Sequence, residues 1–532
     1  MELSYFDRDI FIKNLETEWV WDILIIGGGA TGSGVALDSA SRGFKTLLLE
    51  GADFAKGTSG RSTKLIHGGV RYLSQGNIRL VYRALHEREL LFINAPHLVK
   101  KKTFIIPCYH WLTKIKYFIG LKLYDLLAGN FNIGKSKLLN KKRILDQLPT
   151  LDPNKLVGGV AYSDGQFDDA RMALNIAQTA AERGASVLNY FKVRGFLKDN
   201  GKITGVIAIN EESKREFTIR SKVVINATGV FVDEILRMDE AESIAQVRPS
   251  QGVHLVVDKK FLNSDHAMMI PNTSDGRVLF AVPWHNKLLL GTTDTLLNKS
   301  LLEPVPLDKE IDFILDTVGN YLTKPPERKD ILSMFAGLRP LAITGKNEDK
   351  TKEIPRDHKL IVSHSGLVTI TGGKWTTYRK MSELTVDKAI IIGELKKVSC
   401  STKQIKIHGS PSTIAFLNSV YGSDQKHINS MIDHDPSLGA LLIDSYHFTI
   451  AEVIFAVRFE MARNVEDVLA RRIRLLFLDA GAAIKAAPKV ARIIAGELDY
   501  DQNWESEQIA AFKLLASNYL ISEEKKVVWD AK

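Results

Sequence analysis

Apolar and polar residues near the N-terminus follow a pattern that predicts a strand, a glycine turn, a helix and a second strand. Apolar runs occupy residues 23–26 and 46–49, and Gly27, Gly29 and Gly32 stand between them in G-x-G-x-x-G spacing. A helix N-terminus binds a pyrophosphate because its free N–H groups and its dipole favour negative charge, and side chains at the glycines would block that approach. The pattern therefore predicts a dinucleotide site, although a glycine-rich turn without a ligand would share the three glycines.

An acid and a polar loop follow the second apolar run. Glu50 lies 18 residues beyond Gly32, where a carboxylate at the end of a strand can accept a hydrogen bond from a ribose 2′-hydroxyl. Residues 51–72 are rich in Gly, Ser and Thr. We expect them to form an ordered loop that holds a cofactor's phosphates or ring system, the alternative being a solvent loop of turn formers.

Later segments differ in the period of their apolar residues. Residues 77–94 and 168–183 have apolar positions at helical spacing, whereas three stretches within residues 252–294 have the composition of strands. These stretches, GVHLVVD, RVLFAVPW and KLLLGTTD, predict an antiparallel sheet. The pattern becomes helical toward the C-terminus and is strongest at residues 452–478, which places a domain boundary near residue 400.

Length and composition bound the architecture. A chain of 532 residues with 45% hydrophobic residues is too long for one ordinary domain, so we expect two or three domains. The two cysteines, Cys108 and Cys400, match no metal or redox spacing, which favours a reducing compartment and indicates no metal site. No run of 18 apolar residues occurs and the N-terminus lacks a continuous apolar core, so we expect neither secretion nor a membrane span.

The net charge of +9 is concentrated in one segment. Residues 100–143 contain 11 Lys and Arg against one acid. Within them, residues 111–129 place an apolar arc that includes Trp111, Ile115 and Phe118 on one side of a helix, with lysines at its border. Such a helix suits an anionic membrane surface, and it suits equally the protein's own core with solvated lysines outside. Nucleic acid is a poorer partner, because no recognised binding module surrounds the patch.

Seven motifs, taken in order, resemble those of the FAD-dependent glycerol-3-phosphate dehydrogenases. They are GGGATGSG, TSGRSTKLIHGGVRYL, INATG, GVHLVV, GTTDT, GLRPL and GGKWTTYRK. The similarity extends through VEDVLARRIRLLFLDA and so covers nearly the whole chain. The resemblance implies oxidation of sn-glycerol 3-phosphate to dihydroxyacetone phosphate, with electrons passing from noncovalently bound FAD to a membrane quinone.

The resemblance also implies a fold. It is an α/β FAD-binding fold, Rossmann-like and of the glutathione-reductase type, with an antiparallel-sheet substrate domain and an all-α C-terminal domain. We expect residues 1–400 to form the composite FAD-binding and substrate-binding region and residues 401–532 to form the helical domain. The FAD-binding parts are expected at about residues 20–80, 155–235 and 350–390.

The implied reaction assigns roles to polar residues in the matching motifs. Hydride transfer from an alcohol carbon requires a base for the hydroxyl proton and a cation beside the developing alkoxide, and a phosphate tail suits the planar fork of arginine. His254 resembles the base, and Arg339 and Lys374 resemble the residues that stabilise negative charge. The phosphate ligands implied by the resemblance are Arg71 and Arg356, with Tyr72 as a hydroxyl donor. Taken singly, an arginine is usually a surface charge and a histidine is usually structural.

The cofactor contacts implied by the same motifs come from four parts of the chain. They are Gly27, Gly29, Ala30, Thr31, Gly32, Glu50, Thr58, Ser59, Ser62, Lys64, Ile66, Val193, Ala227, Gly229, Gly373 and Thr376. FAD is favoured over NAD because a soluble NAD enzyme has no use for the late Gly372-Gly373-Lys374 loop. The chain also lacks the second G-x-G-x-x-G and the C-x-x-C pair that a flavoprotein of the disulfide-reductase type would carry.

Alternative functions remain open from the sequence. An oxidase that passes electrons to oxygen and forms hydrogen peroxide would share the fold and the substrate site. An amine or amino-acid oxidase would not explain the arginines, and a flavin-binding scaffold without activity would leave His254, Arg339 and Lys374 without a purpose. We expect peripheral attachment to the inner face of the cytoplasmic membrane through about residues 100–143, since a quinone is confined to the bilayer. A homodimer is possible, and no nucleic-acid partner is expected.

Overall fold

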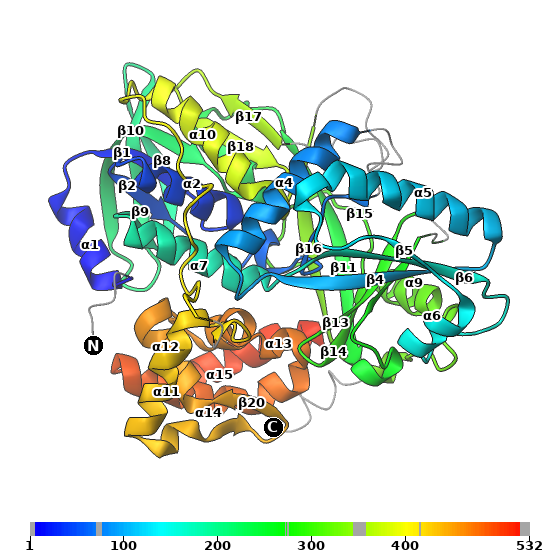
Figure 1. Ribbon diagram of the computed structural model, residues 1–532. Helices are drawn as coiled ribbons and strands as arrows, with labels where there is room; N and C mark the ends of the chain where they lie inside the picture. The colour runs from blue at the N-terminus through cyan, green and yellow to red at the C-terminus, as the bar shows by residue number, and fades with distance from the viewer. Residues whose placement is uncertain are drawn as a thin grey trace.

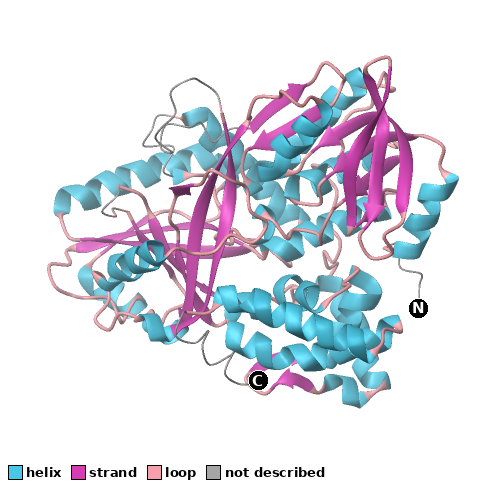
Figure 2. Cartoon of the chain, turned by 180° about the vertical axis from the view of Figure 1, so that it is seen from behind, coloured by secondary structure: helices cyan, strands magenta, loops and turns pink. Residues whose placement is uncertain are grey.

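The computed structural model describes residues 6–70, 77–271, 273, 276–343, 358–413 and 416–521. Two large sheets form the body of the molecule, and the C-terminal helices gather in a separate layer below them (Figure 1). The same three parts are visible from behind, where the long strands of the second sheet stand in the centre (Figure 2). This arrangement agrees with the expected combination of two sheet regions and a helical C-terminal part.

The first sheet has the strand order β17-β18-β10-β1-β2-β7, in which only the β17–β18 pair is antiparallel. Its strands are β1 (Trp21–Ile26), β2 (Thr46–Leu49), β7 (Ser186–Leu188), β10 (Glu216–Asn226), β17 (His358–Val362) and β18 (Val368–Gly372). A ribbon of β8 (Phe191–Asp199) and β9 (Lys202–Asn210) continues from β10. The helices around this sheet are α1 (Arg8–Thr17), α2 (Ala30–Ser41), α7 (Asp169–Glu182), α8 (Val232–Asp239) and α10 (Tyr378–Ile392).

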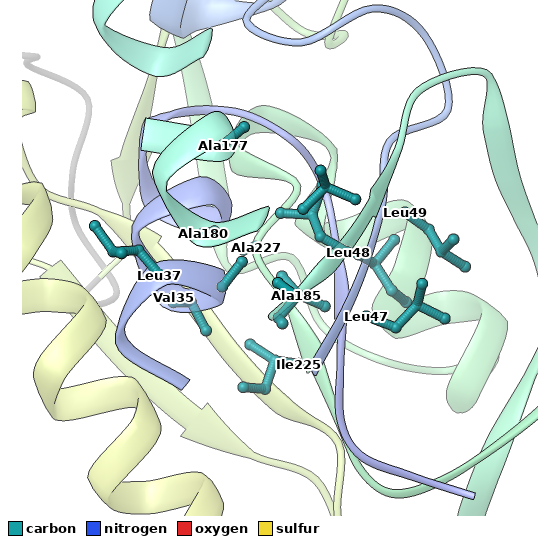
Figure 3. Close-up of a cluster of buried hydrophobic side chains, with 14 of the residues drawn as sticks. Val35, Leu37, Leu47, Leu48, Leu49, Ala177, Ala180, Ala185, Ile225 and Ala227 are labelled. Atoms are coloured by element: carbon teal, nitrogen blue, oxygen red, sulfur yellow. The ribbon is translucent and has the colours of Figure 1, made fainter. Parts of the chain in front are cut away.

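The predicted strand, turn, helix and strand at the N-terminus are confirmed by β1, α2 and β2. Parallel strands covered on both faces read as continuous apolar runs, and Ile23, Leu24 and Ile25 are fully buried. Figure 3 shows side chains of α2, α7, β2 and β10 meeting in one cluster, with Val35 and Leu37 beside Ala177 and Ala180. This core fixes the start of α2 against the ends of β1 and β10.

The second sheet has the order β15-β11-β14-β13-β12-β4-β6-β3, with β16 paired to β11 and β5 to β6. Its strands are β3 (Leu65–Ile66), β4 (Lys100–Cys108), β5 (Lys137–Leu139), β6 (Gly158–Gln166), β11 (Val247–Asp258), β12 (Ala267–Ile270), β13 (Leu279–Trp284), β14 (Lys287–Gly291), β15 (Thr295–Leu296) and β16 (Ile331–Ala342). The antiparallel sheet predicted within residues 252–294 is confirmed, because β11, β14 and β13 pair antiparallel in that order. The helices of this part are α4 (Ile78–Asn94), α5 (Trp111–Ala128), α6 (Lys141–Gln147) and α9 (Asp308–Gly319).

The pairing of β11 with β16 brings two predicted catalytic residues to one face of the second sheet. His254 lies opposite Phe335, and Ser250 lies opposite Arg339. Residues two and four positions apart along a strand point to the same side. His254 and Arg339 therefore share a face although they come from different strands.

The C-terminal part consists of α11 (Gln425–His434), α12 (Ile450–Glu460), α13 (Leu475–Leu478), α14 (Ala480–Leu498), α15 (Gln502–Ala516) and the hairpin β19 (Leu441–Ile443) and β20 (Tyr446–Thr449). The helical segment expected at residues 452–478 is interrupted. Met461 and Arg474 have left-handed backbone conformations, and Asp467–Arg472 form a π-helical stretch. Arg471 and Arg472 leave the regular pattern to pair with Asp53 of the first sheet region, so tertiary ion pairs override the local preference. The domain boundary near residue 400 stays a prediction.

Helix α5 turns its apolar arc to solvent, at the outer edge of the molecule on the right of Figure 1. Its exposed apolar residues are Trp111, Leu112, Ile115, Ile119, Leu123 and Leu126, whereas Phe118 is half-buried. The opposite face packs inward through Lys114, Leu121, Tyr124 and Ala128. The interpretation that this arc faces the protein's own core is therefore wrong. Lys114 also departs from the expected border of solvated lysines, because it is buried with its ammonium nitrogen 4.7 Å from the centre of the Trp111 ring.

Candidate active site

The glycine turn between β1 and α2 forms a cradle with backbone N–H groups at its rim. Gly27 has φ +109°, a conformation that favours glycine, and a Cβ atom at Gly32 would lie 1.8 Å from the carbonyl oxygen of Gly27. Gly29 is the N-cap of α2 and supplies no side chain, and the N–H of Ala30 donates to Ser59 Oγ at 2.9 Å. The N–H groups of a first helical turn lack partners within the helix. The cradle is therefore suited to a pyrophosphate at the start of α2.

Glu50 lies beside this cradle at the end of β2. Its two carboxylate oxygens accept hydrogen bonds from the N–H of Gly28 at 2.6 Å and from the N–H of Ala52 at 2.8 Å. Burial raises the pKa of Glu50, and the two backbone N–H groups partly offset the rise. A carboxylate has about four acceptor positions, so two remain for ribose hydroxyls. The location fits the role expected for Glu50.

Ala227 and Gly229 follow β10 and reach the same cradle. The N–H of Ala227 donates to the carbonyl of Ile26 at 2.9 Å, and a Cβ atom at Gly27 would lie 2.8 Å from the carbonyl oxygen of Ala227. Gly229 has φ +62°, and among the described residues no heavy atom beyond its chain neighbours lies within 4 Å of the place that its Cβ would occupy. The small-residue turn after β10 thus lies against the first glycine turn.

A cavity of about 240 Å³ opens where the two sheets meet. Its walls come from the loop after β2, from β11 and β16, and from the turn after β18. Seven residues singled out in the sequence line it, namely Thr58, Ser62, His254, Arg339, Gly373, Lys374 and Thr376. The fold therefore brings together the three residues expected to be catalytic and part of the residues expected to hold the cofactor.

His254 lies in the cavity wall with a side chain that is almost entirely buried. Its Nε2 lies 2.9 Å from the hydroxyl oxygen of Thr63, and its ring stacks on Phe335 with centroids 4.9 Å apart. Its Nδ1 is buried without a hydrogen-bond partner among the described residues. Burial lowers the pKa of His254 well below 6.5, and the positive charges of Lys64 and Arg339 lower it further. The imidazole is therefore neutral at physiological pH and able to accept a proton.

Arg339 is held by the turn after β14. Its Nη1 donates to the carbonyl of Thr293 at 3.1 Å and lies 3.2 Å from Asp294 Oδ1, and its Nη2 donates to Thr292 Oγ1 at 3.1 Å. Thr293 is itself fixed, because its hydroxyl donates to buried Glu310 at 2.8 Å. These contacts hold a cation in the cavity wall with its geometry set in advance.

The turn after β18 supplies Gly373, Lys374 and Thr376. Gly373 has φ +77°, and a Cβ atom there would lie 2.3 Å from the sulfur of Met381, so a larger residue would displace the turn. Lys374 precedes the short helix of residues 375–377, and its ammonium nitrogen is buried. The indole N–H of Trp375 donates to the carbonyl of Ser59 at 2.9 Å. The turn is thus joined to the loop that carries Thr58 and Ser62.

Some predicted site residues do not reach the cavity. The side chain of Lys64 is fully buried against Asp169, and burial lowers the pKa of Lys64 from 10.5 to about 7. Ile66 lies in the core on β3, and Val193 lies in the core on β8, so neither side chain faces the cavity wall. Arg71, Tyr72 and Arg356 lie outside the described residues. The expected role of Lys64 as a cofactor contact stays a prediction.

The sequence did not indicate which residues contact His254 and Arg339 and hold them in position. Thr63 bonds to His254, Phe335 stacks on it, and Asp294 pairs with Arg339. Thr63 and Asp294 stand inside the motifs TSGRSTKLIHGGVRYL and GTTDT, so the motifs marked the segments without indicating which side chains meet.

Comparison with known proteins decides the family. Residues 22–379 match the family described as FAD dependent oxidoreductase, and residues 368–505 match the C-terminal domain of alpha-glycerophosphate oxidase. The chain is 41% identical to the mitochondrial glycerol-3-phosphate dehydrogenase of Mesocricetus auratus, over 93% of this chain and 73% of that protein. The chain belongs to the FAD-dependent glycerol-3-phosphate dehydrogenases. The mitochondrial enzyme of Arabidopsis thaliana is 40% identical, over 92% of this chain and 85% of its own length.

One solved structure of this family supports the same assignment, and a second solved structure shares the fold. The glycerol-3-phosphate dehydrogenase of Bacillus halodurans, solved in complex with FAD, is 30% identical and covers 97% of this chain and 98% of its own, with a TM-score of 0.78. The L-alpha-glycerophosphate oxidase of Mycoplasma pneumoniae is 18% identical, covers 72% of this chain and 97% of its own, and has a TM-score of 0.56. The second similarity shows the fold alone.

The residues present fit the FAD of this family. The cradle at Gly29 accepts a pyrophosphate because it has no side chain there, and Glu50 retains acceptor positions for a ribose. The cavity lined by His254 and Lys374 adjoins the Thr58–Gly60 helix, whose Ser59 bonds to the start of α2. Bound FAD supplies the acceptor of a hydride at its isoalloxazine ring. The chain itself supplies the buried imidazole of His254, the side chains of Arg339 and Lys374, and the walls of the cavity.

Proposed function

We propose that this glycerol-3-phosphate dehydrogenase oxidises sn-glycerol 3-phosphate to dihydroxyacetone phosphate and passes the electrons from FAD to a membrane quinone. The observation that carries the proposal is the joint placement of His254, Arg339 and Lys374 in one cavity beside the cofactor cradle. The relatives from Mesocricetus auratus and Bacillus halodurans bear the name glycerol-3-phosphate dehydrogenase.

His254 is assigned as the base that takes the proton of the substrate hydroxyl. A base must be unprotonated, and the lowered pKa keeps the imidazole neutral. Nε2 lies 2.9 Å from the hydroxyl oxygen of Thr63, a contact that orients the imidazole in the cavity wall. Arg339 and Lys374 offset the negative charge that develops as the proton leaves.

The substrate phosphate is assigned to Arg71 and Arg356, with Tyr72 as a hydroxyl donor, by their motifs alone. Replacing either arginine by Ala should weaken glycerol 3-phosphate binding by about 2 kcal/mol, the loss expected for one charge-assisted contact. Free glycerol should be a poor substrate. Glycerol oxidised as efficiently as its phosphate would remove this assignment.

Anaerobic stopped-flow mixing tests the reaction and the acceptor separately. Glycerol 3-phosphate should bleach the absorbance of bound flavin in the absence of any acceptor. The reduced protein is then mixed with a quinone or with oxygen, and the faster reoxidation identifies the acceptor. Rapid reoxidation of the flavin by oxygen, with formation of hydrogen peroxide, would favour the oxidase. The match of residues 368–505 to the C-terminal domain of alpha-glycerophosphate oxidase is consistent with that alternative.

The exposed apolar arc of α5 supports docking on an anionic membrane. Lys116 and Lys122 lie on the same helix with exposed side chains, and each basic residue near an anionic surface contributes about 1 kcal/mol. Burial of the apolar side chains adds to binding. No helix among the described residues is long and apolar enough to cross a bilayer. We place the protein on the inner face of the cytoplasmic membrane, attached through α5 and its neighbours in residues 100–143.

Sedimentation with anionic liposomes tests this attachment. Replacing Trp111, Ile115 and Ile119 by Ser should release the protein and lower activity with long-tailed quinones, while activity with a soluble dye remains. Replacing Lys116 and Lys122 by Glu should release it as well, and salt should weaken binding of the unchanged protein. Wild-type liposome binding in both variants would exclude α5 as the attachment surface.

A matched control uses apolar residues far from α5. Ile10 and Trp19 are exposed on and just after α1, at the opposite side of the molecule in Figure 1. Replacing both by Ser should leave liposome binding unchanged. The homodimer stays a prediction, which sedimentation velocity in detergent can check.

A further inference from the structure

An arginine from the C-terminal part reaches the loop beneath the cavity. Arg474 precedes α13 in a left-handed conformation with φ +66° and is 2% exposed. Its Nη2 donates to the carbonyl of Gly60 at 3.0 Å and to Asp169 Oδ1 at 2.9 Å. The guanidinium also lies over the ring of Phe477, 4.5 Å from its centroid. The C-terminal part thus contacts directly the loop that follows Ser59.

Asp169 binds the same loop from the first turn of α7. Its Oδ2 accepts hydrogen bonds from the backbone N–H of Ser62 at 2.8 Å, from the Ser62 hydroxyl at 2.7 Å and from Lys64 Nζ at 2.6 Å. Lys64 Nζ also donates to the carbonyl of Gly60 at 3.1 Å. Asp169 and Lys64 are fully buried. A buried carboxylate with these partners fixes the path of residues 60–64, because losing one partner leaves an uncompensated charge.

Thr63, which lies between Ser62 and Lys64, contacts the proposed base His254. The Thr63 hydroxyl lies 2.9 Å from His254 Nε2. Lys64 Nζ lies 5.2 Å from the centroid of the Phe335 ring, on which the imidazole stacks. A shift of residues 60–64 would therefore move the hydrogen-bond partner of His254.

We propose that Arg474 and Asp169 are positioning residues that hold residues 60–64 and, through Thr63, set the orientation of His254. The C-terminal part then completes the active site without lining its cavity. The inference rests on the proposed role of His254 in the oxidation of glycerol 3-phosphate. Neither residue lines the cavity, so each acts through the loop.

Hydrogen exchange measured by mass spectrometry on the FAD-loaded protein tests the structural step without reference to activity. Amides of residues 60–64 should exchange faster in Asp169→Asn and in Arg474→Met than in the unchanged protein. The first variant removes the carboxylate that binds Ser62 N–H and Lys64, and the second removes one of the two donors to the carbonyl of Gly60. The matched control is Arg463→Met, which removes another ion pair between the C-terminal part and the first sheet region, that with Glu212. This control should leave exchange at residues 60–64 unchanged.

Anaerobic flavin reduction by glycerol 3-phosphate tests the consequence. The limiting rate constant should fall about 10- to 100-fold in Asp169→Asn and Arg474→Met, the cost of a displaced catalytic group, with FAD retained. The substrate concentration for half the limiting rate should change less than about 3-fold, because neither residue is assigned to the phosphate. The double variant should be little slower than either single one, since both act on the same loop.

Each outcome decides the inference. Hydrogen exchange at residues 60–64 that is unchanged in both variants would overturn the inference. A fall in the rate of flavin reduction that is fully explained by loss of FAD would overturn it as well. Equal slowing in Arg463→Met would overturn it too, because a general loosening of the interface would then suffice. If Asp169→Asn fails to fold, Arg474→Lys replaces it and should give intermediate exchange and rate. If glycerol 3-phosphate does not reduce the flavin of the unchanged protein, the proposed function fails, while the exchange data still decide whether the two residues hold the loop.

Discussion

The Nε2 atom of His254 lies 2.9 Å from the hydroxyl oxygen of Thr63, although the two residues are 191 positions apart in the chain. His254 stands on β11 of the second sheet, and Thr63 stands in the loop that follows the cofactor cradle. The contact joins two walls of the cavity that come from distant parts of the chain. His254 can act as a base only while its imidazole is unprotonated, so the rate of flavin reduction should depend on pH.

Flavin reduction should depend on a histidine that stays neutral to unusually low pH. Burial lowers the pKa of His254 below 6.5, so the active, unprotonated form persists as pH falls through 6.5 and is lost only below it. The limiting rate of flavin reduction should be flat between pH 6.5 and 8 as far as His254 is concerned. Stopped-flow reduction across this range measures it, and an acid limb centred above pH 6.5 would contradict the assignment.

His254→Ala should slow flavin reduction by about 10²- to 10⁴-fold, the range expected for loss of a general base, while FAD stays bound. His447→Ala, at an exposed histidine on β20, serves as the control and should reduce flavin at the normal rate. Reduction at wild-type speed in His254→Ala would remove His254 from this role.

Gly29→Val should abolish retention of FAD. A Cβ atom at Gly29 would lie 2.9 Å from Ser59 Oγ and over the N-terminus of α2, where the pyrophosphate is expected. The flavin absorbance of the purified, folded protein measures the loss. Gly496→Ala is the control, because a Cβ atom there would meet no heavy atom within 4 Å from the part of the structure that is described outside its own helix backbone. A flavin spectrum of normal intensity in Gly29→Val would place the pyrophosphate elsewhere.

Arg339→Lys should slow flavin reduction by about 10²-fold, the cost of removing one preorganised donor beside developing charge. Lysine keeps the charge but cannot reproduce the separate hydrogen bonds of Arg339 to Thr293 and Thr292. FAD content should be normal, and stopped-flow reduction measures the rate. Arg328→Lys, at a surface arginine with its own carboxylate partners, should have no effect.

His408 should make stability depend on pH above neutrality. Burial alone would lower the pKa of His408, but the carboxylates of Asp424 and Glu182 outweigh it and raise the pKa to about 10. A folded-state pKa above the ordinary 6.5 stabilises the fold fully below pH 6.5, and the stabilisation is lost as pH rises toward 10. The unfolding temperature should therefore fall between pH 6.5 and 10.

His408→Gln should lower the free energy of unfolding by about 2 kcal/mol at pH 6.5, the order of one hydrogen bond to a charged group. The difference between the unchanged protein and the variant should shrink as pH approaches 10. Calorimetry at several pH values measures this difference, with His434→Gln at an exposed helix end as the control. A difference that stays constant with pH would show that His408 does not carry a charge in the folded protein.

The sequence by itself determined the local units of this protein. The glycine spacing and the flanking apolar runs specified β1, the cradle and α2, because a tight turn, a helix start and two buried strands each depend on residues close together in the chain. The same reasoning located the strands within residues 252–294 and helix α7, whose N-cap is Asp168. The motifs also indicated the family, and they contain seven residues singled out in the sequence that line the cavity.

Only the tertiary structure decided which distant side chains meet and which faces remain exposed. Periodicity gives a helix an apolar arc but not what covers that arc, so the exposure of Trp111 on α5 could not be read from the sequence. Thr63 reaches His254, and Arg474 reaches Asp169, through pairing of strands and packing of separate parts. The break at Arg474 has the same origin, because its buried ion pair with Asp169, in a distant segment, outweighs the local helical preference.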